Sequence, residues 1–222
     1  MIVPAFDEAL RISATLASIP DYVDAIYVID DASTDGTGAA AVATGDPRLE
    51  LVRLAENQGV GAAIRTGYER ALAGQADILV VMAGDGQMDP ADLPALLEPL
   101  AAAKADYVKG NRFRHPARRR MPRLRRWAGK ALATATRGAT GLAIDDSQCG
   151  YTAMSAHAAR SLPLRDLWPR YGYPNDLLGM LAAQGLRVAE VPVRPVYAGE
   201  ASGVRPWHAF VVLYVIARRW VR

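Results

Sequence analysis

A run of four apolar residues near the middle of the chain, Ile78–Val81, ends at an acidic, glycine-rich corner. A short apolar run bounded by turn residues is typical of a strand that is buried on both faces of a sheet. The corner at residues 83–87 therefore lies at the carboxyl end of a central strand, where open α/β sheets bind their ligands. Asp85 in this corner can hold a hard divalent cation through oxygen. Its alternative role is to cap the helix that follows.

Strand-like and helix-like patterns alternate on both sides of this strand. Alternation at this spacing predicts βαβ units with right-handed crossovers. We therefore expect an α/β fold with a mostly parallel, Rossmann-like sheet flanked by helices. The expected strands cover residues 2–4, 22–29, 49–54, 78–82, 106–110, 151–154 and 188–193, and the expected helices cover 9–19, 37–44, 62–73, 90–103, 124–137, 176–184 and 207–220.

Composition limits the class of protein and its compartment. At 222 residues, of which 51% are hydrophobic, the chain is long enough for one packed domain with an appended arm. The single Cys149 excludes an internal disulfide bond and indicates a reducing compartment. No charged segment followed by an apolar one opens the chain, and no apolar run reaches the roughly 20 residues that span a bilayer. We expect a cytoplasmic protein without a secretory signal.

Positive charge is concentrated in one short segment, although the net charge is only +3. Such clusters bind the phosphate groups of nucleic acids, nucleotides or lipids, or else form a solvated surface. Nucleic acid is not an expected partner, because no recognised nucleic-acid-binding motif accompanies the charges. The segment contains Arg112, Arg114, His115, Arg118, Arg119, Arg120, Arg123, Arg125 and Arg126, and a second group, Arg218, Arg219 and Arg222, closes the chain.

Acidic residues follow three of the strands expected in the first half of the chain: Glu8, the pair Asp30 and Asp31, and Asp85. The carboxyl ends of parallel strands meet at one rim of the sheet. A rim of carboxylates suits a nucleotide whose ribose hydroxyls and base need acceptors, with a metal shielding the diphosphate. The GxGxxG pattern of dinucleotide-binding folds is missing after the first strand. Asp30 and Asp31 could alternatively cap the following helix.

Seven short motifs, taken in order, resemble the successive signatures of family 2 glycosyltransferases. Within that family the chain is similar to the branch of polyprenyl-phosphate and dolichyl-phosphate sugar synthases. The similarity covers nearly the whole chain except its C-terminal segment, and the order of the motifs makes it more specific than any one of them. The motifs are residues 2–8 (IVPAFDE), 28–37 (VIDDASTDGT), 57–63 (NQGVGAA), 85–90 (DGQMDP), 110–113 (GNRF), 146–151 (DSQCGY) and 190–193 (EVPV).

The resemblance implies a GT-A fold, a nucleotide-sugar donor such as a UDP- or GDP-hexose, Mg²⁺ or Mn²⁺ as cofactor, and inversion at the anomeric carbon. Asp85 is the expected metal ligand. The family usually has Asp-x-Asp here, but Ala83 stands where the first Asp would be, so the metal would rest on Asp85, the diphosphate and water. The expected nucleotide-binding residues are Pro4, Phe6, Glu8, Asp30, Asp31, Gly59, Ala83 and Asp85, with Ser202 and Arg205 in a loop that closes over the diphosphate.

On the acceptor side, the resemblance implies that Arg112 and Arg125 contact phosphate and that Asp176 lies beside the acceptor. Together with Asp85, these are the expected catalytic residues. A hydroxyl acceptor needs a base, for which Asp176 or Asp146 could serve, whereas a phosphate acceptor arrives already ionised. The cationic segment favours polyprenyl phosphate as the acceptor. Transfer to a saccharide or small-molecule hydroxyl, and an inactive nucleotide-binding module, are the alternatives.

We expect a glycosyltransferase domain over residues 1–205, with a nucleotide-binding half at 1–110 and an acceptor-side half at 111–205. Residues 206–222 are expected to form a C-terminal amphipathic helix that lies in the membrane interface, which makes the protein peripheral at the cytoplasmic face. Alternatively, this helix packs on the domain or on a second protomer, as a homodimer. Its aromatic residues at headgroup level would be Trp207, Tyr214 and Trp220.

Overall fold

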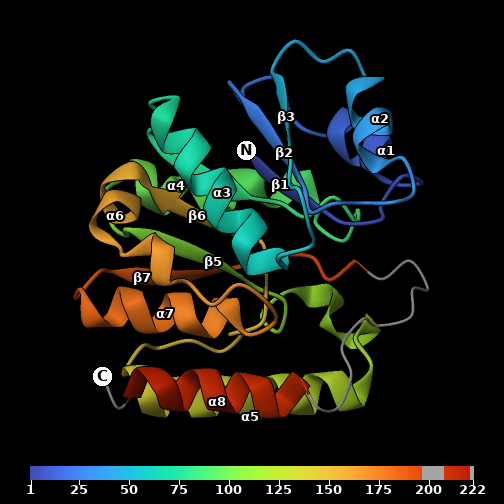
Figure 1. Cartoon of the computed structure of the whole chain (residues 1–222). Coiled ribbons are helices and arrows are strands. Elements are labelled where there is room, and N and C mark those ends of the chain that lie inside the picture. The colour runs from blue at the N-terminus through green and yellow to red at the C-terminus, as the bar shows by residue number, and fades with distance from the viewer. Residues whose placement is uncertain (197–207, 221–222) are drawn as a thin grey trace.

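The computed structural model describes residues 1–196 and 208–220, and it places a seven-stranded sheet at the centre of the molecule (Figure 1). The strand order is β3-β2-β1-β4-β6-β5-β7. The predictions for Ser202, Arg205 and Trp207 lie outside the described residues. The strands are β1 (Ile2–Ala5), β2 (Ile26–Asp30), β3 (Leu49–Arg53), β4 (Ile78–Val81), β5 (Tyr107–Asn111), β6 (Thr152–Ser155) and β7 (Val188–Pro192).

Most strand pairs in this sheet are parallel, which confirms the predicted fold class. β1, β2, β3 and β4 pair in parallel, as do β5 and β7, whereas β6 lies antiparallel between β4 and β5. The helices are α1 (Ile12–Ala17), α2 (Thr37–Val42), α3 (Val60–Ala73), α4 (Leu93–Ala101), α5 (Arg123–Thr140), α6 (Ala156–Ser161), α7 (Tyr173–Ala183) and α8 (His208–Trp220), with short 3₁₀ turns η1 (Pro90–Asp92), η2 (Pro116–Arg120) and η3 (Leu164–Asp166).

Apolar side chains from both faces of the sheet form two cores. Along β4, Leu79 and Val81 pack into the core beneath α3, α6 and α7, while Val80 and Met82 pack into the opposite core beneath α1 and α4. Side chains of successive strand residues point to opposite faces, so this strand is buried on both sides, as its apolar run predicts.

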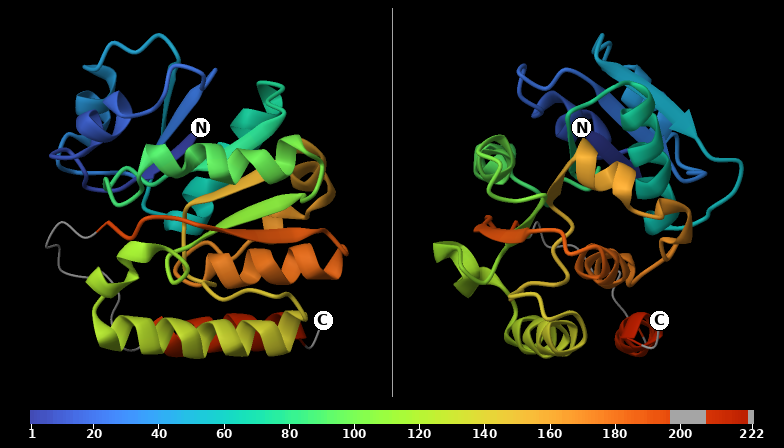
Figure 2. Two further views of the ribbon diagram at one scale, coloured as in Figure 1. Left: turned by 180° about the vertical axis from the view of Figure 1, so that it is seen from behind. Right: turned by 90° about the vertical axis from the view of Figure 1, so that its left-hand side faces the viewer.

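α5 and α8 lie side by side as an outer layer beyond α7, away from the sheet (Figure 2). α8 buries Val212 and Val215 and exposes Phe210 and Leu213, which confirms the predicted amphipathic C-terminal helix. Among the described helices, none combines the length and the apolar character that crossing a bilayer requires.

Several elements differ from those expected; α7, for example, begins at Tyr173 and not at residue 176. The strand expected from residue 22 begins at Ile26, because Arg48 holds residues 20–25 in a turn by donating to the carbonyl oxygens of Pro20 and Val23. The helix expected over residues 9–19 is shortened to α1, because residues 8–11 form a turn instead. α6 was not expected; it follows β6 directly, and Ser155 Oγ caps it.

Candidate active site

The carboxyl ends of β1, β2 and β4 enclose a cavity of about 190 Å³. It gathers six of the predicted nucleotide-binding residues, which come from the motifs at residues 2–8 and 28–37 and from the corner after β4, and Phe6 at its edge is 46% exposed. All but one of the acidic residues expected at the carboxyl ends of the strands therefore line one cavity. The cavity is lined by Pro4, Ala5, Phe6, Glu8, Asp31, Val60, Ala63, Ala83, Gly84 and Asp85.

Hydrogen bonds join the loop after β1 to the loop after β2 at the cavity edge. The amide of Glu8 donates to Thr37 Oγ1 at 2.8 Å, and the amide of Thr34 donates to Asp7 Oδ1 at 2.8 Å. Asp7 has a φ of +54°, a left-handed conformation that L residues adopt only when their surroundings hold them there. Two motifs that lie far apart in the sequence thus position Glu8 together.

The two carboxylates that follow one another at the end of β2 have different partners. Asp31 lines the cavity, and its Oδ1 and Oδ2 accept the amides of Gln58 and Gly59, both at 2.8 Å. Asp30 is buried behind the cavity, where its Oδ1 accepts the amide of Ser33 and its Oδ2 lies 3.8 Å from the Arg53 guanidinium. Neither caps α2, which begins after Gly36 without a side-chain cap.

The corner after β4 presents Asp85 to the cavity through a tight turn. Asp85 Oδ1 accepts the amide of Gln87 at 3.0 Å, and Gly86 has a φ of +72°. Gly84 lets this corner approach both α1 and β1, since a Cβ there would lie 2.8 Å from Ile12 Cδ1 and 3.3 Å from Ala5 Cβ. Asp85 is half-buried, and Ala83 beside it brings no second carboxylate.

The residues of this corner fit a cation that arrives with a diphosphate rather than one held by protein ligands alone. Within the described part of the chain, no group of three His, Cys, Asp or Glu side chains could hold a metal ion. Mg²⁺ is often bound through one or two carboxylates together with substrate phosphates and water. Asp85 supplies one such carboxylate.

A second constellation forms around Arg112. Its guanidinium makes a bidentate pair with the buried Asp146, Nε to Oδ2 at 2.8 Å and Nη2 to Oδ1 at 2.9 Å. Burial alone would raise the pKa of Asp146, but the charge and hydrogen bonds of Arg112 outweigh it and lower the pKa. Asp146 is therefore an ionised partner that orients Arg112, and its Oδ2 also accepts the Arg112 amide at 3.1 Å. Its role as a base stays a prediction.

Glu190 joins three of the motifs into one network. Its Oε1 accepts the amide of Asp146 at 2.8 Å, and its Oε2 accepts the amide of Asp145 at 3.0 Å and Asn111 Nδ2 at 2.7 Å. Nearby, the buried Lys109 donates to the carbonyl oxygen of Cys149, and burial lowers the pKa of Lys109. Sequence reasoning assigned no role to Glu190 or Asn111; a single acid within the apolar strand β7 was the available signal.

The two arginines predicted to contact phosphate, Arg112 and Arg125, both affect the pKa of the Tyr171 hydroxyl group. Burial raises the pKa of Tyr171, and the charges of Arg112 and Arg125 both oppose that shift. Arg125 lies in the first turn of α5 and is half-buried. Arg112 and Arg125, from separate elements, therefore both lie within electrostatic range of Tyr171.

Asp176 lies in the first turn of α7 with no exposed surface. Its Oδ2 accepts the amide of Trp168 at 2.8 Å. A general base has to reach the proton that it removes. In this structure Asp176 is a buried carboxylate bonded to the main chain of Trp168, so it positions that segment, and its catalytic role stays a prediction.

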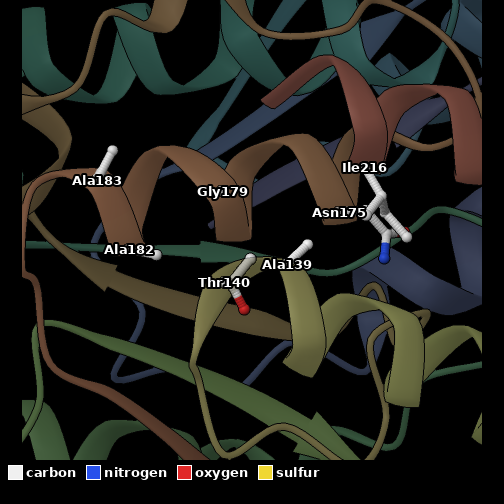
Figure 3. Close-up of a pocket in the computed structure, with 7 residues that line it drawn as sticks. All are labelled: Ala139, Thr140, Asn175, Gly179, Ala182, Ala183 and Ile216. Atoms are coloured by element: carbon white, nitrogen blue, oxygen red, sulfur yellow. The ribbon is translucent and has the colours of Figure 1, made fainter. Parts of the chain in front are cut away.

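A second cavity, of about 260 Å³, lies between α5, α7 and α8 (Figure 3). Its described lining residues are mostly small, and none of them is ionisable. Asn175 at its wall is bonded to Thr136 Oγ1 and to Gln148 Nε2. The lining residues are Ala139, Thr140, Asn175, Gly179, Ala182, Ala183 and Ile216, and they offer no group for catalysis.

Comparison with known proteins agrees with this fold and with the family that the motifs resemble. The model of the family "Glycosyl transferase family 2" matches residues 1–161. The chain is 34% identical over 204 residues to the undecaprenyl-phosphate mannosyltransferase of Micrococcus luteus, covering 86% of this chain and 81% of that protein. It is 26% identical over 232 residues to the UDP-N-acetylglucosamine–dolichyl-phosphate N-acetylglucosaminyltransferase of Methanococcus voltae, covering 96% and 92%.

Among solved structures, glucosyl-3-phosphoglycerate synthase from Mycobacterium tuberculosis, crystallised with Mn²⁺, uridine diphosphate and glucosyl-3-phosphoglycerate, matches with a TM-score of 0.73 at 24% identity. The match covers 99% of this chain and 78% of that one. Fold and site together define a glycosyltransferase with the GT-A fold. The chain belongs to glycosyl transferase family 2, and its relatives include polyprenyl-phosphate and dolichyl-phosphate sugar transferases, as the seven motifs predict.

Proposed function

We propose that this enzyme transfers one hexose from UDP- or GDP-hexose to a polyprenyl phosphate at the cytoplasmic face of the membrane. The observation that carries the proposal is the cavity at the carboxyl ends of β1, β2 and β4, which combines an exposed ring, two carboxylates of the nucleotide motifs and Asp85. The sequence relatives from Micrococcus luteus and Methanococcus voltae, whose names specify lipid-phosphate acceptors, support the acceptor class.

In this proposal different cavity residues bind different parts of the nucleotide-sugar donor. Pro4 and Phe6 frame the base, while Glu8 and Asp31 lie where ribose hydroxyls and base amides need acceptors. Asp85 would hold Mg²⁺ or Mn²⁺ together with the diphosphate. A divalent cation bound there supplies charge stabilisation to the leaving phosphate.

The transfer itself is a single displacement. An oxygen of the acceptor phosphate forms a bond to the anomeric carbon, while the bond from that carbon to the diphosphate oxygen breaks and its electron pair leaves with the nucleoside diphosphate. The acceptor phosphate is already ionised, so no base is required, which is consistent with the buried Asp176 and the ion-paired Asp146. Arg112 and Arg125 would hold the acceptor phosphate through charge-assisted hydrogen bonds.

The donor is tested by thermal unfolding with UDP, GDP, UDP-glucose and GDP-mannose, each with Mg²⁺, Mn²⁺ or EDTA. A ligand that binds the native state raises its stability by RT ln(1 + [L]/Kd). We expect the nucleotides of one base to raise the Tm in the presence of metal, and EDTA to remove most of that rise. The absence of any shift would contradict an active enzyme and favour the inactive module.

We propose that this enzyme binds the membrane surface through its outer helices, α5 and α8. Leu124 and Trp127 on α5 and Phe210 on α8 are 81%, 76% and 75% exposed, and we call them the α5–α8 apolar surface. Both helices begin at the end of the molecule where the parallel strands end (Figure 1). The exposed arginines of η2, immediately before α5, suit anionic headgroups, while the apolar residues suit the interface beneath them.

Replacing all three of these arginines, as Arg118→Ala/Arg119→Ala/Arg120→Ala, is expected to weaken binding to anionic vesicles. At about 1 kcal/mol for each arginine near such a surface, the loss is on the order of 100-fold at low salt. Cosedimentation with anionic and with neutral vesicles measures it. Val42→Ala, an exposed apolar residue at the end of α2, is the control. Unchanged vesicle binding and unchanged turnover of the lipid substrate in the triple variant would contradict the membrane proposal.

A further inference from the structure

The segment between η3 and α7, residues 168–172, connects two distant parts of the molecule, and we call it the strap. On one side the strap contacts the start of α3 beside the donor cavity. On the other side it contacts α8, one of the two helices of the outer layer in Figure 2. Asp176 fixes its first residue by accepting the amide of Trp168.

The main chain of the strap lies directly on the turn that begins α3. The carbonyl oxygen of Pro169 accepts the amide of Ala62 at 3.0 Å. Gly59 has a φ of +99°, and a Cβ there would lie 2.7 Å from that same carbonyl oxygen. A Cβ on Gly61 would overlap the carbonyl oxygen of Trp168. Only glycine at these two positions allows so close a contact, which explains the spacing of the NQGVGAA motif.

The same turn forms part of the donor cavity. Asp31, on the cavity wall, accepts the amides of Gln58 and Gly59, and Val60 and Ala63 line the cavity beside it. A shift of the strap would therefore move the residues that contact the donor. The strap lies behind the turn and contributes none of the described residues that line the cavity.

α8 holds the opposite side of the strap through Trp168, and it also lies close to Gly172, where a Cβ would lie 3.3 Å from Val215 Cγ2. The rings of Trp168 and Tyr214 meet edge to face, with their centroids 5.9 Å apart, and the Arg218 guanidinium lies 5.7 Å from the centre of the Trp168 ring. Trp168 Nε1 is buried without a hydrogen-bond partner among the described residues. The indole is therefore held by packing and cation–π contacts and not by a hydrogen bond of its own.

We propose that Trp168 and Tyr214 are positioning residues for the nucleotide site, through which α8 keeps the Gly59 turn in its binding conformation. The inference about affinity rests on the donor site proposed above. A turn that is already ordered binds its ligand at lower cost than one that must be ordered on binding. Donor affinity thus depends on a helix that lies on the far side of α7 from the sheet.

The test compares Tyr214→Ala with Tyr214→Phe, which keeps the ring, and with the control Leu213→Ala, a neighbouring exposed residue of α8. Hydrogen exchange of the Gly59 and Ala62 amides is measured first, without ligand or vesicles. We expect faster exchange in Tyr214→Ala alone, because those two amides are bonded to Asp31 and to the strap. Calorimetry with UDP or GDP and Mg²⁺ then measures Kd, which should rise about fivefold in Tyr214→Ala and recover in Tyr214→Phe.

Two results would overturn the inference. Unchanged exchange at Gly59 and Ala62 in Tyr214→Ala would show that α8 does not hold the turn. Faster exchange with an unchanged Kd would show that the turn does not govern donor affinity. If the wild-type protein bound neither UDP nor GDP, the donor assignment would fail, and the exchange rates alone would still decide whether α8 orders the Gly59 turn.

Discussion

The variant Asp85→Ala is expected to lose about 100- to 1,000-fold in kcat/KM, the range for removing one group that stabilises charge in a transition state. Asp85 is the only carboxylate that the β4 corner brings to the cavity, because Ala83 occupies the other position. The loss should be accompanied by loss of the metal-dependent rise in Tm with nucleotide. Transfer of labelled hexose to polyprenyl phosphate in detergent measures the rate.

Asp77→Ala is the matched control for this experiment. Asp77 precedes the same strand at its opposite end and is exposed, so its removal should leave turnover near the wild-type value. Equal losses in the two variants would indicate damage to β4 rather than loss of a ligand. A normal metal-dependent nucleotide response in Asp85→Ala would contradict the assignment of Asp85 to the metal.

The second large effect is expected from Asp146→Asn, which should lower the free energy of unfolding by about 3 kcal/mol. The substitution keeps the volume of the side chain but leaves the Arg112 guanidinium, only 25% exposed, without its ionised partner. Denaturant unfolding measures the change. Asp145→Asn provides the comparison, because Asp145 pairs with the exposed Arg114 and Arg137 and should contribute less than about 1 kcal/mol.

The difference between wild type and Asp146→Asn should also depend on pH. Since Arg112 lowers the pKa of Asp146 in the folded state, the wild type binds fewer protons at this site than the unfolded chain does. The stabilisation is therefore fully present above the unfolded pKa of about 3.9 and is lost as the pH falls through the lower folded pKa. Unfolding curves of the two proteins should converge in acid. A constant difference down to that range would contradict the ion pair.

The sequence was sufficient for the parts of the fold that depend on local pattern. The apolar run of β4 predicted burial on both faces, and the acidic strand ends predicted the rim that encloses the cavity. The antiparallel direction of β6 was not predictable, because the sequence of a four-residue strand does not indicate whether it pairs parallel or antiparallel.

The remaining differences at the site come from long-range packing. Asp30 and Asp31 are adjacent in an extended segment, so their side chains point to opposite sides, and the sequence does not say which side faces the cavity. Asp176 is buried because the strap folds over it, and Glu190 bonds to residues at least 44 positions away. Neither the burial of Asp176 nor the long-range hydrogen bonds of Glu190 produce a periodic pattern in the sequence from which they could be predicted.

The network around Glu190 also bears on how the protein is made. Among the described residues, those that line the cavity at the ends of β1, β2 and β4 all lie within the first 85 positions, and these segments emerge from the ribosome first. The carboxylate that ties together Asn111, Asp145 and Asp146 emerges only with β7. A nascent chain that ends before residue 190 therefore has these described cavity-lining residues but not the group that orders the loops around Arg112, so the Glu190 network is completed late in synthesis.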